Sequence, residues 1–162
     1  MASIGAFEGT SGVLDRLAPR LRRFARILLA GRGRPTAPDE IVQAALARLR
    51  LPHPASDAAI RVAAYGAVIQ AHRARQMTFS QTTEPGRASG RLEIAERVEK
   101  LPLDQREVLL LVVLEQFTYD EAATALGLPQ SSIVARLVRA RGSLDTTREE
   151  SPVRHTHLRL VK

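Results

Sequence analysis

The sequence predicts an all-α fold built from two small helical bundles joined by a flexible linker. Aromatic residues make up only 4% of the 162 positions, Ala, Leu and Arg dominate, and no stretch of strand length alternates apolar and polar residues. These features favour helix over strand. Residues 77–91 are rich in Thr, Ser, Gln, Gly and Pro, have no apolar period, and are the expected linker between residues 12–76 and residues 92–147. The sequence leaves open whether the two bundles rest apart or pack together.

The charge of the chain points to a polyanionic partner. The formal net charge is +7, and residues 12–76 hold twelve arginines against four acids, whereas residues 92–147 hold six basic residues against nine acids. We expect nucleic acid before membrane, because the sequence shows no long apolar run and no terminal signal pattern. The absence of cysteine removes disulfides and suits a cytoplasmic location. Membrane insertion is not expected.

The first bundle opens with a long helix. Residues 1–11 are small and polar and are expected to form a loose lead-in. From Val13 onward an apolar stripe recurs at helical spacing, formed by Leu14, Leu17, Leu21, Phe24 and Leu28. The other face carries arginines, namely Arg16, Arg20, Arg22, Arg23 and Arg26. Such a basic face is either solvated surface or a contact for phosphate or an acidic partner.

Two further helices complete this bundle. One has Pro38 in its first turn, followed by Asp39 and Glu40 near the positive end of the helix dipole. The other is expected to run from a cap at Ser56 to about Arg75. Its predicted inward side chains are Ile60, Ala64, Ala67, Val68 and Ala71.

The second bundle begins with a short helix over residues 92–100, and Pro102 starts the next helix. Residues 108–114 are apolar around the whole circumference of a helix, so we expect them at the centre of the bundle. Residues 148–162 are expected to form a flexible tail. His155 and His157 lie in that tail without a third ligand, so no metal and no cofactor are expected.

Residues 118–144 have the pattern of a helix-turn-helix. Thr118 and Glu121 form a T-x-x-E capping box that opens one helix, and Gly127 ends it in a left-handed turn conformation. The second helix is expected to start at Ser131 or Ser132, whose side chains suit an N-cap.

The second of these helices has one core face and one free face. Its core stripe is Ile133, Leu137, Ala140 and Leu144, whereas Ser131, Ala135, Val138 and Gly142 lie on the other side. A helix presented in this way contacts base edges with its N-terminal residues and phosphates with its arginines. The alternative is a two-helix corner that only packs a small domain.

Two parts of the chain resemble a known family, the extracytoplasmic-function (ECF) sigma factors of bacteria. Region four of that family is similar to the segment LPLDQREVLLLVVLEQFTYDEAATALGLPQSSIVARLVRAR, and region two is similar to LRRFARILL and PDEIVQAALARL. The resemblance covers most of residues 12–144. It implies two helical domains that bind core RNA polymerase and direct it to promoter DNA, with no catalysis and with an anti-sigma factor as a further partner.

The resemblance also implies roles for particular residues. It places Asp39, Glu40 and Gln43 on the surface that grips the clamp helices of the polymerase. The helix from Arg61 to Arg75 would approach the −10 element, with Arg73 and Arg75 at phosphates. The implied contacts of the −35 element are Gln130, Ser131, Ser132, Ala135, Arg136, Arg139 and Arg141.

This chain departs from the family pattern at the positions that read DNA. Ser131–Arg136 reads SSIVAR where the family usually has GTVKSR, and Arg61, Val68 and His72 stand where region two usually has Trp, Asn and Asp. Side chains that stack on or bond to an extruded base are therefore missing. The chain is either a divergent sigma factor or a sigma mimic.

The residues bear on three classes of function. The first is a sigma factor, and the second is a sigma-like decoy that captures an anti-sigma factor in a stress response without reading DNA. The third is an enzyme, which the sequence does not support, because no nucleophile–base pair, phosphate loop or metal cluster is readable.

Overall fold

The computed structural model describes residues 3–30, 37–51, 54–78 and 93–149. These residues are helical or lie in short connections, and none of them forms a strand, which confirms the all-α prediction. In the described part of the chain, no helix is both long enough and apolar enough to pass through a bilayer.

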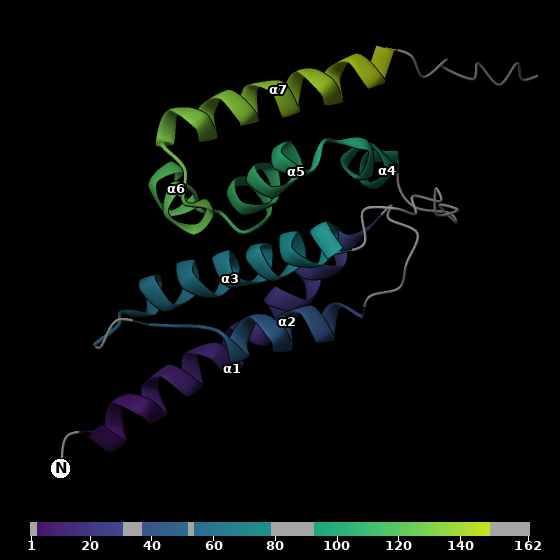
Figure 1. Ribbon diagram of the computed structural model, residues 1–162. Helices are drawn as coiled ribbons and strands as arrows, with labels where there is room; N and C mark the ends of the chain where they lie inside the picture. Colours follow the sequence, from purple (N-terminus) through teal and green to yellow (C-terminus); the bar gives the residue numbers. More distant parts are fainter. Residues whose placement is uncertain (1–2, 31–36, 52–53, 79–92, 150–162) are drawn as a thin grey trace, which may run out of the picture.

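The first half of the molecule consists of three mutually packed helices, α1 (Ser3–Leu29), α2 (Pro38–Ala47) and α3 (Asp57–Thr78) (Figure 1). Most of the predicted stripe of α1 is buried, namely Leu17, Leu21, Phe24 and Leu28. The expected loose lead-in over residues 1–11 is wrong for residues 3–11, because α1 already begins at Ser3. Pro19 is tolerated inside α1 on its exposed side, where water can bond the carbonyl that loses its helical partner.

Local signals set the starts of α2 and α3. Pro38 occupies the first turn of α2, with Asp39 and Glu40 in the same turn. At α3 the hydroxyl of Ser56 accepts a hydrogen bond from the backbone N–H of Ala59 at 3.2 Å, as the cap prediction requires. The helix continues to Thr78, so it takes in the first two residues assigned to the linker, and residues 79–92 lie outside the described part.

The second half contains α4 (Glu93–Lys100), α5 (Leu103–Leu109), a π-helical turn η1 (Leu110–Leu114), α6 (Tyr119–Leu126) and α7 (Gln130–Glu149). In η1 the backbone N–H of Glu115 donates to the carbonyl of Leu110 at 3.1 Å. The apolar run of residues 108–114 is central only in part. Its first four residues are buried, whereas Val113 is 60% exposed.

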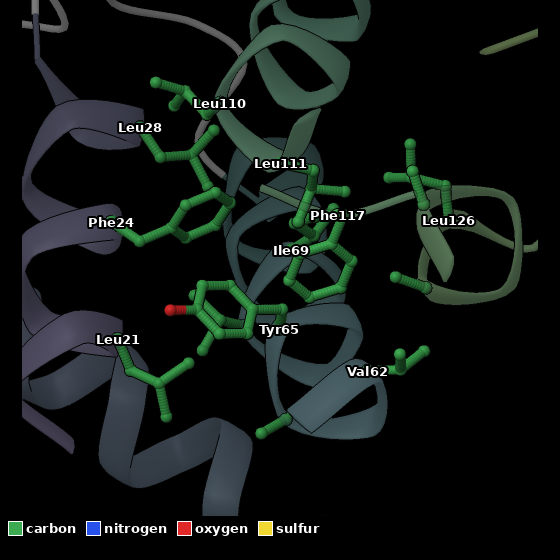
Figure 2. Packing of buried hydrophobic residues seen from close by; sticks show 14 of the residues in the cluster. Leu21, Phe24, Leu28, Val62, Tyr65, Ile69, Leu110, Leu111, Phe117 and Leu126 are labelled. Atoms are coloured by element: carbon green, nitrogen blue, oxygen red, sulfur yellow. The ribbon is translucent and has the colours of Figure 1, made fainter. Parts of the chain in front are cut away.

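The two halves pack together through one continuous core. Helix α3 lies between the α1–α2 pair and the second half, and it contacts α1, α2 and α6 (Figure 1). Figure 2 shows Phe24, Tyr65 and Phe117 in a row across this core. Tyr65 meets Phe24 edge-to-face at 5.1 Å between ring centroids and Phe117 at 5.2 Å. Both faces of α3 are therefore buried, and the separate-bundle boundaries 12–76 and 92–147 stay a prediction.

Gly66 allows α3 and α6 to approach closely. A Cβ atom built at Gly66 would lie 2.7 Å from the carbonyl oxygen of Ala125 on α6. Real Cβ atoms do not come so near to a backbone oxygen, so any other residue at this position would push the two helices apart.

A buried arginine joins the ends of α1 and α4. The Nη1 of Arg106 donates to the carbonyls of Leu28 at 3.3 Å and Ala30 at 2.9 Å. Its Nη2 donates to the carbonyls of Glu99 and Leu101. Carbonyls at the ends of helices lack partners within the helix, and the guanidinium of Arg106 supplies hydrogen-bond donors to them.

Candidate nucleic-acid and polymerase interfaces

Residues 118–144 form the predicted helix-turn-helix. The hydroxyl of Thr118 accepts from the backbone N–H of Glu121 at 3.2 Å, and the carboxylate of Glu121 accepts from the backbone N–H of Thr118 at 2.9 Å. Gly127 ends α6 at φ 64° and ψ 38°. Both the capping box and the left-handed glycine are thus confirmed.

The second helix begins earlier than expected. Its first residue is Gln130, and the carbonyl of Pro129 accepts from the backbone N–H of Ser132 at 2.9 Å. The predicted start at Ser131 or Ser132 is therefore wrong, and both serines lie in the first turn.

Helix α7 presents a free face next to its core stripe. Ile133, Leu137 and Ala140 are buried, as expected, and Leu144 is half-buried. The exposed residues that the sequence assigned to DNA are Gln130, Ser131, Ala135, Arg139 and Arg141, while Ser132 is half-buried. Two valines share the free surface, with Val134 42% and Val138 64% exposed.

Arg136 points toward α5 and not outward. Its side chain is 21% exposed, and its Nε lies 3.6 Å from a carboxylate oxygen of Asp104. Its buried Nη1 has no hydrogen-bond partner among the described residues. Arg136 lines a hollow of about 460 Å³ together with Arg73 and Glu107.

The two arginines at the end of α3 are held by carboxylates. Arg73 donates through Nε to the fully buried carboxylate of Glu107 at 3.0 Å, and a second bond joins the same two groups. This bond raises the pKa of the Arg73 guanidinium. Arg75 reaches a carboxylate oxygen of Glu40 at 3.3 Å. In the packed molecule the guanidinium of Arg73 is therefore not free to meet a phosphate, whereas the partly exposed Arg75 is held only by a surface ion pair.

The predicted polymerase-binding residues share one surface of α2. Asp39, Glu40 and Gln43 are all exposed. Arg22 pairs with Asp39 at 2.6 Å, and Arg75 pairs with Glu40. Exposed ion pairs contribute only about 0–1 kcal/mol, so a partner's basic groups can displace these arginines.

The positions aligned with the promoter-opening residues of region two lie on α3 and are buried or half-buried. Val68 and His72 are buried, and the guanidinium of Arg61 lies 4.4 Å from the ring centroid of Phe117. Arg61 also pairs with Glu121 at 2.7 Å. The bond from the backbone of Thr118 and then the one from Arg61 lower the pKa of Glu121.

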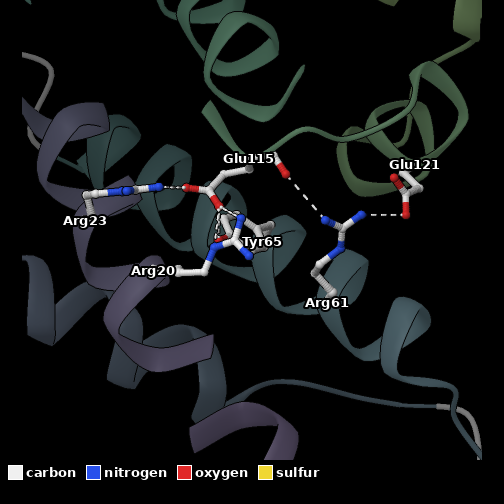
Figure 3. Close-up of polar contacts among 6 residues, drawn as sticks. All are labelled: Arg20, Arg23, Arg61, Tyr65, Glu115 and Glu121. Carbon is white, nitrogen blue, oxygen red and sulfur yellow. Dashed lines mark hydrogen bonds and ion pairs between the residues drawn. The ribbon is translucent and has the colours of Figure 1, made fainter. Parts of the chain in front are cut away.

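Sequence reasoning missed a buried carboxylate at the junction of the two halves. Figure 3 shows Glu115 directed at Arg20, Arg23 and Tyr65. Arg20 lies 3.0 Å and Arg23 3.2 Å from its carboxylate oxygens, and the Tyr65 hydroxyl donates to it at 2.6 Å. Burial and this hydrogen bond raise the pKa of Tyr65. The available signal was a lone acid directly after an apolar run.

Among the residues that the structure describes, no three His, Asp or Glu side chains are grouped to hold a metal ion. The tail histidines His155 and His157 lie outside those residues.

The second half matches a family model described as Sigma-70, region 4, over residues 91–144. The ECF RNA polymerase sigma factor EcfG of Rhodopseudomonas palustris (strain TIE-1) is 40% identical over 65 residues, which are 38% of this chain and 35% of that protein. The match thus spans about a third of the length of this curated relative.

Three solved structures with a similar fold are complexes with the anti-sigma factor NepR. A chain of the PhyRSL–NepR complex from Sphingomonas sp. Fr1 gives a TM-score of 0.67 at 23% identity, covering 88% of this chain and 92% of that one. The sigma factor RpoE complex with NepR from Bartonella quintana gives 0.62 at 21% identity, covering 85% and 96%. The complex of the anti-anti-sigma factor PhyR with NepR from Bartonella quintana gives 0.58 at 22%, covering 85% of this chain but 49% of that one. At these identities the likeness concerns the fold.

Proposed function

We infer from the match to the Sigma-70, region 4 model and from the similarity to an ECF sigma factor that this chain is an extracytoplasmic-function sigma factor, which binds core RNA polymerase and directs it to promoter DNA. The main support for this proposal is the placement of α7. This helix buries one stripe in the helix-turn-helix and leaves its opposite face exposed. A helix in this setting enters the major groove and reads base edges from its N-terminal end. The chain acts as an adaptor without catalysis, in the cytoplasm where polymerase and genome are found.

The side chains on the free face of α7 favour contacts with both base edges and phosphates. Gln130 and Ser131 offer hydrogen bonds at the N-terminal end, and Ala135 offers an apolar contact for a thymine methyl group. Arg139 lies one turn further along and is exposed, with its Nε bonded to the carbonyl of Ala135 at 3.2 Å. Phosphate contact by Arg139 fits this position, whereas the inward direction of Arg136 supports a different role for that residue.

Transcription in vitro tests the proposal. Purified core polymerase with this chain should produce defined run-off transcripts from genomic DNA of the source organism, and core polymerase alone should not. Reversing Asp39 and Glu40 to Lys should abolish the transcripts, because both carboxylates would meet the polymerase. Reversal of the exposed acids Asp15 and Asp145 is the matched control and should leave the transcripts intact. Absence of any transcript with the unaltered chain would reject the sigma-factor role.

The Arg139→Ala variant should bind promoter DNA less tightly and with a weaker dependence on salt. Loss of one phosphate contact reduces the slope of log K against log salt by about 0.9. Fluorescence anisotropy over a salt series measures the slope. Lys100 is exposed at the end of α4, so Lys100→Ala serves as the control, and an unchanged slope in Arg139→Ala would remove Arg139 from the DNA interface.

A second candidate is a sigma-like decoy that captures an anti-sigma factor without reading DNA. It is supported by the resemblance to structures bound to NepR, by the burial of Val68 and His72, and by the exposed Val134 and Val138. Apolar side chains on an exposed helix suit a protein partner. Tight binding of a NepR-type anti-sigma factor together with no DNA affinity at low salt would favour this candidate.

A further inference from the structure

The two halves are held in register by charges of opposite sign. Four arginines of the first half meet three carboxylates of the second half. The pairs are Arg20 and Arg23 with Glu115, Arg61 with Glu121, and Arg73 with Glu107. Positive side chains of the arginine-rich half are therefore paired with carboxylates of the acid-rich half. Part of the positive charge that predicts a polyanionic partner is neutralised inside the molecule.

In these pairs the arginines bind carboxylates with the same groups that could bind phosphates. Glu107 and Glu115 are fully buried, and each accepts two or more charge-assisted hydrogen bonds from side chains of the first half. Guanidinium groups bind carboxylate and phosphate with the same fork of donors. Arg20 and Arg23 remain 47% and 50% exposed, so both are at the rim of the interface and within reach of solvent.

We propose that Arg20, Arg23, Arg61 and Arg73 form a binding surface for the DNA backbone, which Glu107, Glu115 and Glu121 cover in the packed state in place of phosphates. We call these four arginines the masked arginine surface. The proposal rests on the proposed function, because it adds a DNA contact and its control to a DNA-binding protein. Binding of DNA at this surface and packing of the two halves then exclude each other.

The packed state is suited to such competition. Burying a carboxylate costs about as much as its pairing with an arginine returns, so these pairs orient the halves more than they stabilise them. A DNA backbone offers the same guanidiniums many phosphates and releases counterions when it binds. Part of the binding energy is used to separate the halves, so the packed protein binds DNA more weakly than an opened one.

Removal of the covering carboxylates tests the proposal. The triple variant Glu107→Gln, Glu115→Gln and Glu121→Gln keeps side-chain size and should bind a random-sequence duplex about tenfold more tightly than the unaltered chain. Its salt slope should be steeper by about 0.9 for each arginine that reaches a phosphate. The matched control, Asp15→Asn, Asp120→Asn and Asp145→Asn, changes net charge equally at exposed acids. Equal affinities of the two triple variants would overturn the proposal.

Opening the molecule without changing its charge provides an independent test. Gly66→Leu should separate α3 from α6, and Gly12→Leu on α1 is the control, because a Cβ there meets nothing closer than 3.9 Å. The chain has no cysteine, so dyes on Ala47→Cys and Asp145→Cys report separation by energy transfer. Lower transfer with tighter duplex binding supports the proposal, whereas lower transfer with unchanged binding contradicts it. If Gly66→Leu does not open or does not fold, the two triple variants decide.

The outcomes separate this proposal from the function on which it rests. If the unaltered chain drives transcription but the triple Gln variant gains no DNA affinity, the sigma-factor role stands and the masked surface is rejected. If the triple Gln variant gains affinity but no transcript forms, the surface is real and the initiation role fails. A gain for poly-L-glutamate without one for DNA would identify an acidic-protein site and would also overturn the proposal.

Discussion

Replacing Arg106 with methionine is expected to lower the free energy of unfolding by about 3–5 kcal/mol. The guanidinium is buried and donates to four backbone carbonyls, on Leu28, Ala30, Glu99 and Leu101. A buried acceptor left without a donor costs about 1–3 kcal/mol, and the total stays below the sum because some carbonyls become hydrated. Methionine fills much of the vacated volume, so the loss reports mainly on hydrogen bonding.

Urea denaturation followed by circular dichroism measures this loss. Arg141→Met is the matched control, because Arg141 is exposed on α7 and its replacement should change stability by no more than about 0.5 kcal/mol. A loss below about 1 kcal/mol in Arg106→Met would mean that water can replace the guanidinium.

Replacing Glu115 with alanine is expected to cost about 2–4 kcal/mol. The substitution leaves a cavity in the core and removes the acceptor of the buried Tyr65 hydroxyl. The two arginines contribute less, because Arg20 and Arg23 are about half exposed and can turn to water. Most of the expected loss of stability therefore comes from the cavity and from the unpaired hydroxyl of Tyr65.

A double-mutant cycle isolates the contribution of Tyr65. Tyr65→Phe removes the hydroxyl that needs an acceptor, so adding it to Glu115→Ala should recover about 1 kcal/mol relative to the sum of the single losses. Glu115→Gln keeps an acceptor oxygen and should cost clearly less than Glu115→Ala. Additive single losses would show that Glu115 acts through volume and not through its bond to Tyr65.

Local structure in this protein was predictable where the signals lie within one or two turns of helix. The Thr118–Glu121 capping box, the left-handed Gly127 and the cap at Ser56 all depend on groups no more than four residues apart. The buried stripe of α7 follows from helical spacing alone. The helix boundaries were predicted less well, since α1 and α7 both begin before the positions that composition and caps suggested.

The candidate site was predictable in outline and not in orientation. Most of the residues assigned to DNA on α7 are exposed, yet Arg136 turns toward Asp104, and Arg73 is bound to Glu107. Helical spacing places Arg136 beside the core stripe and does not say whether an acid on α5 lies within reach. The contacts of the assigned α7 residues and of Arg73 with DNA stay predictions. The contacts of Asp39, Glu40 and Gln43 with polymerase also stay predictions.

The sequence alone determined the helical class, the helix-turn-helix and the excess of arginine in the first half, because each of these is written in short-range spacing or in composition. Only the tertiary structure decided that α3 is buried on both faces, with Tyr65 and Ile69 turned to partners that the chain order keeps distant. It also decided which acids meet which arginines. Burial of a carboxylate such as Glu115 depends on several side chains converging from three separate elements, and no local pattern in the chain specifies that convergence.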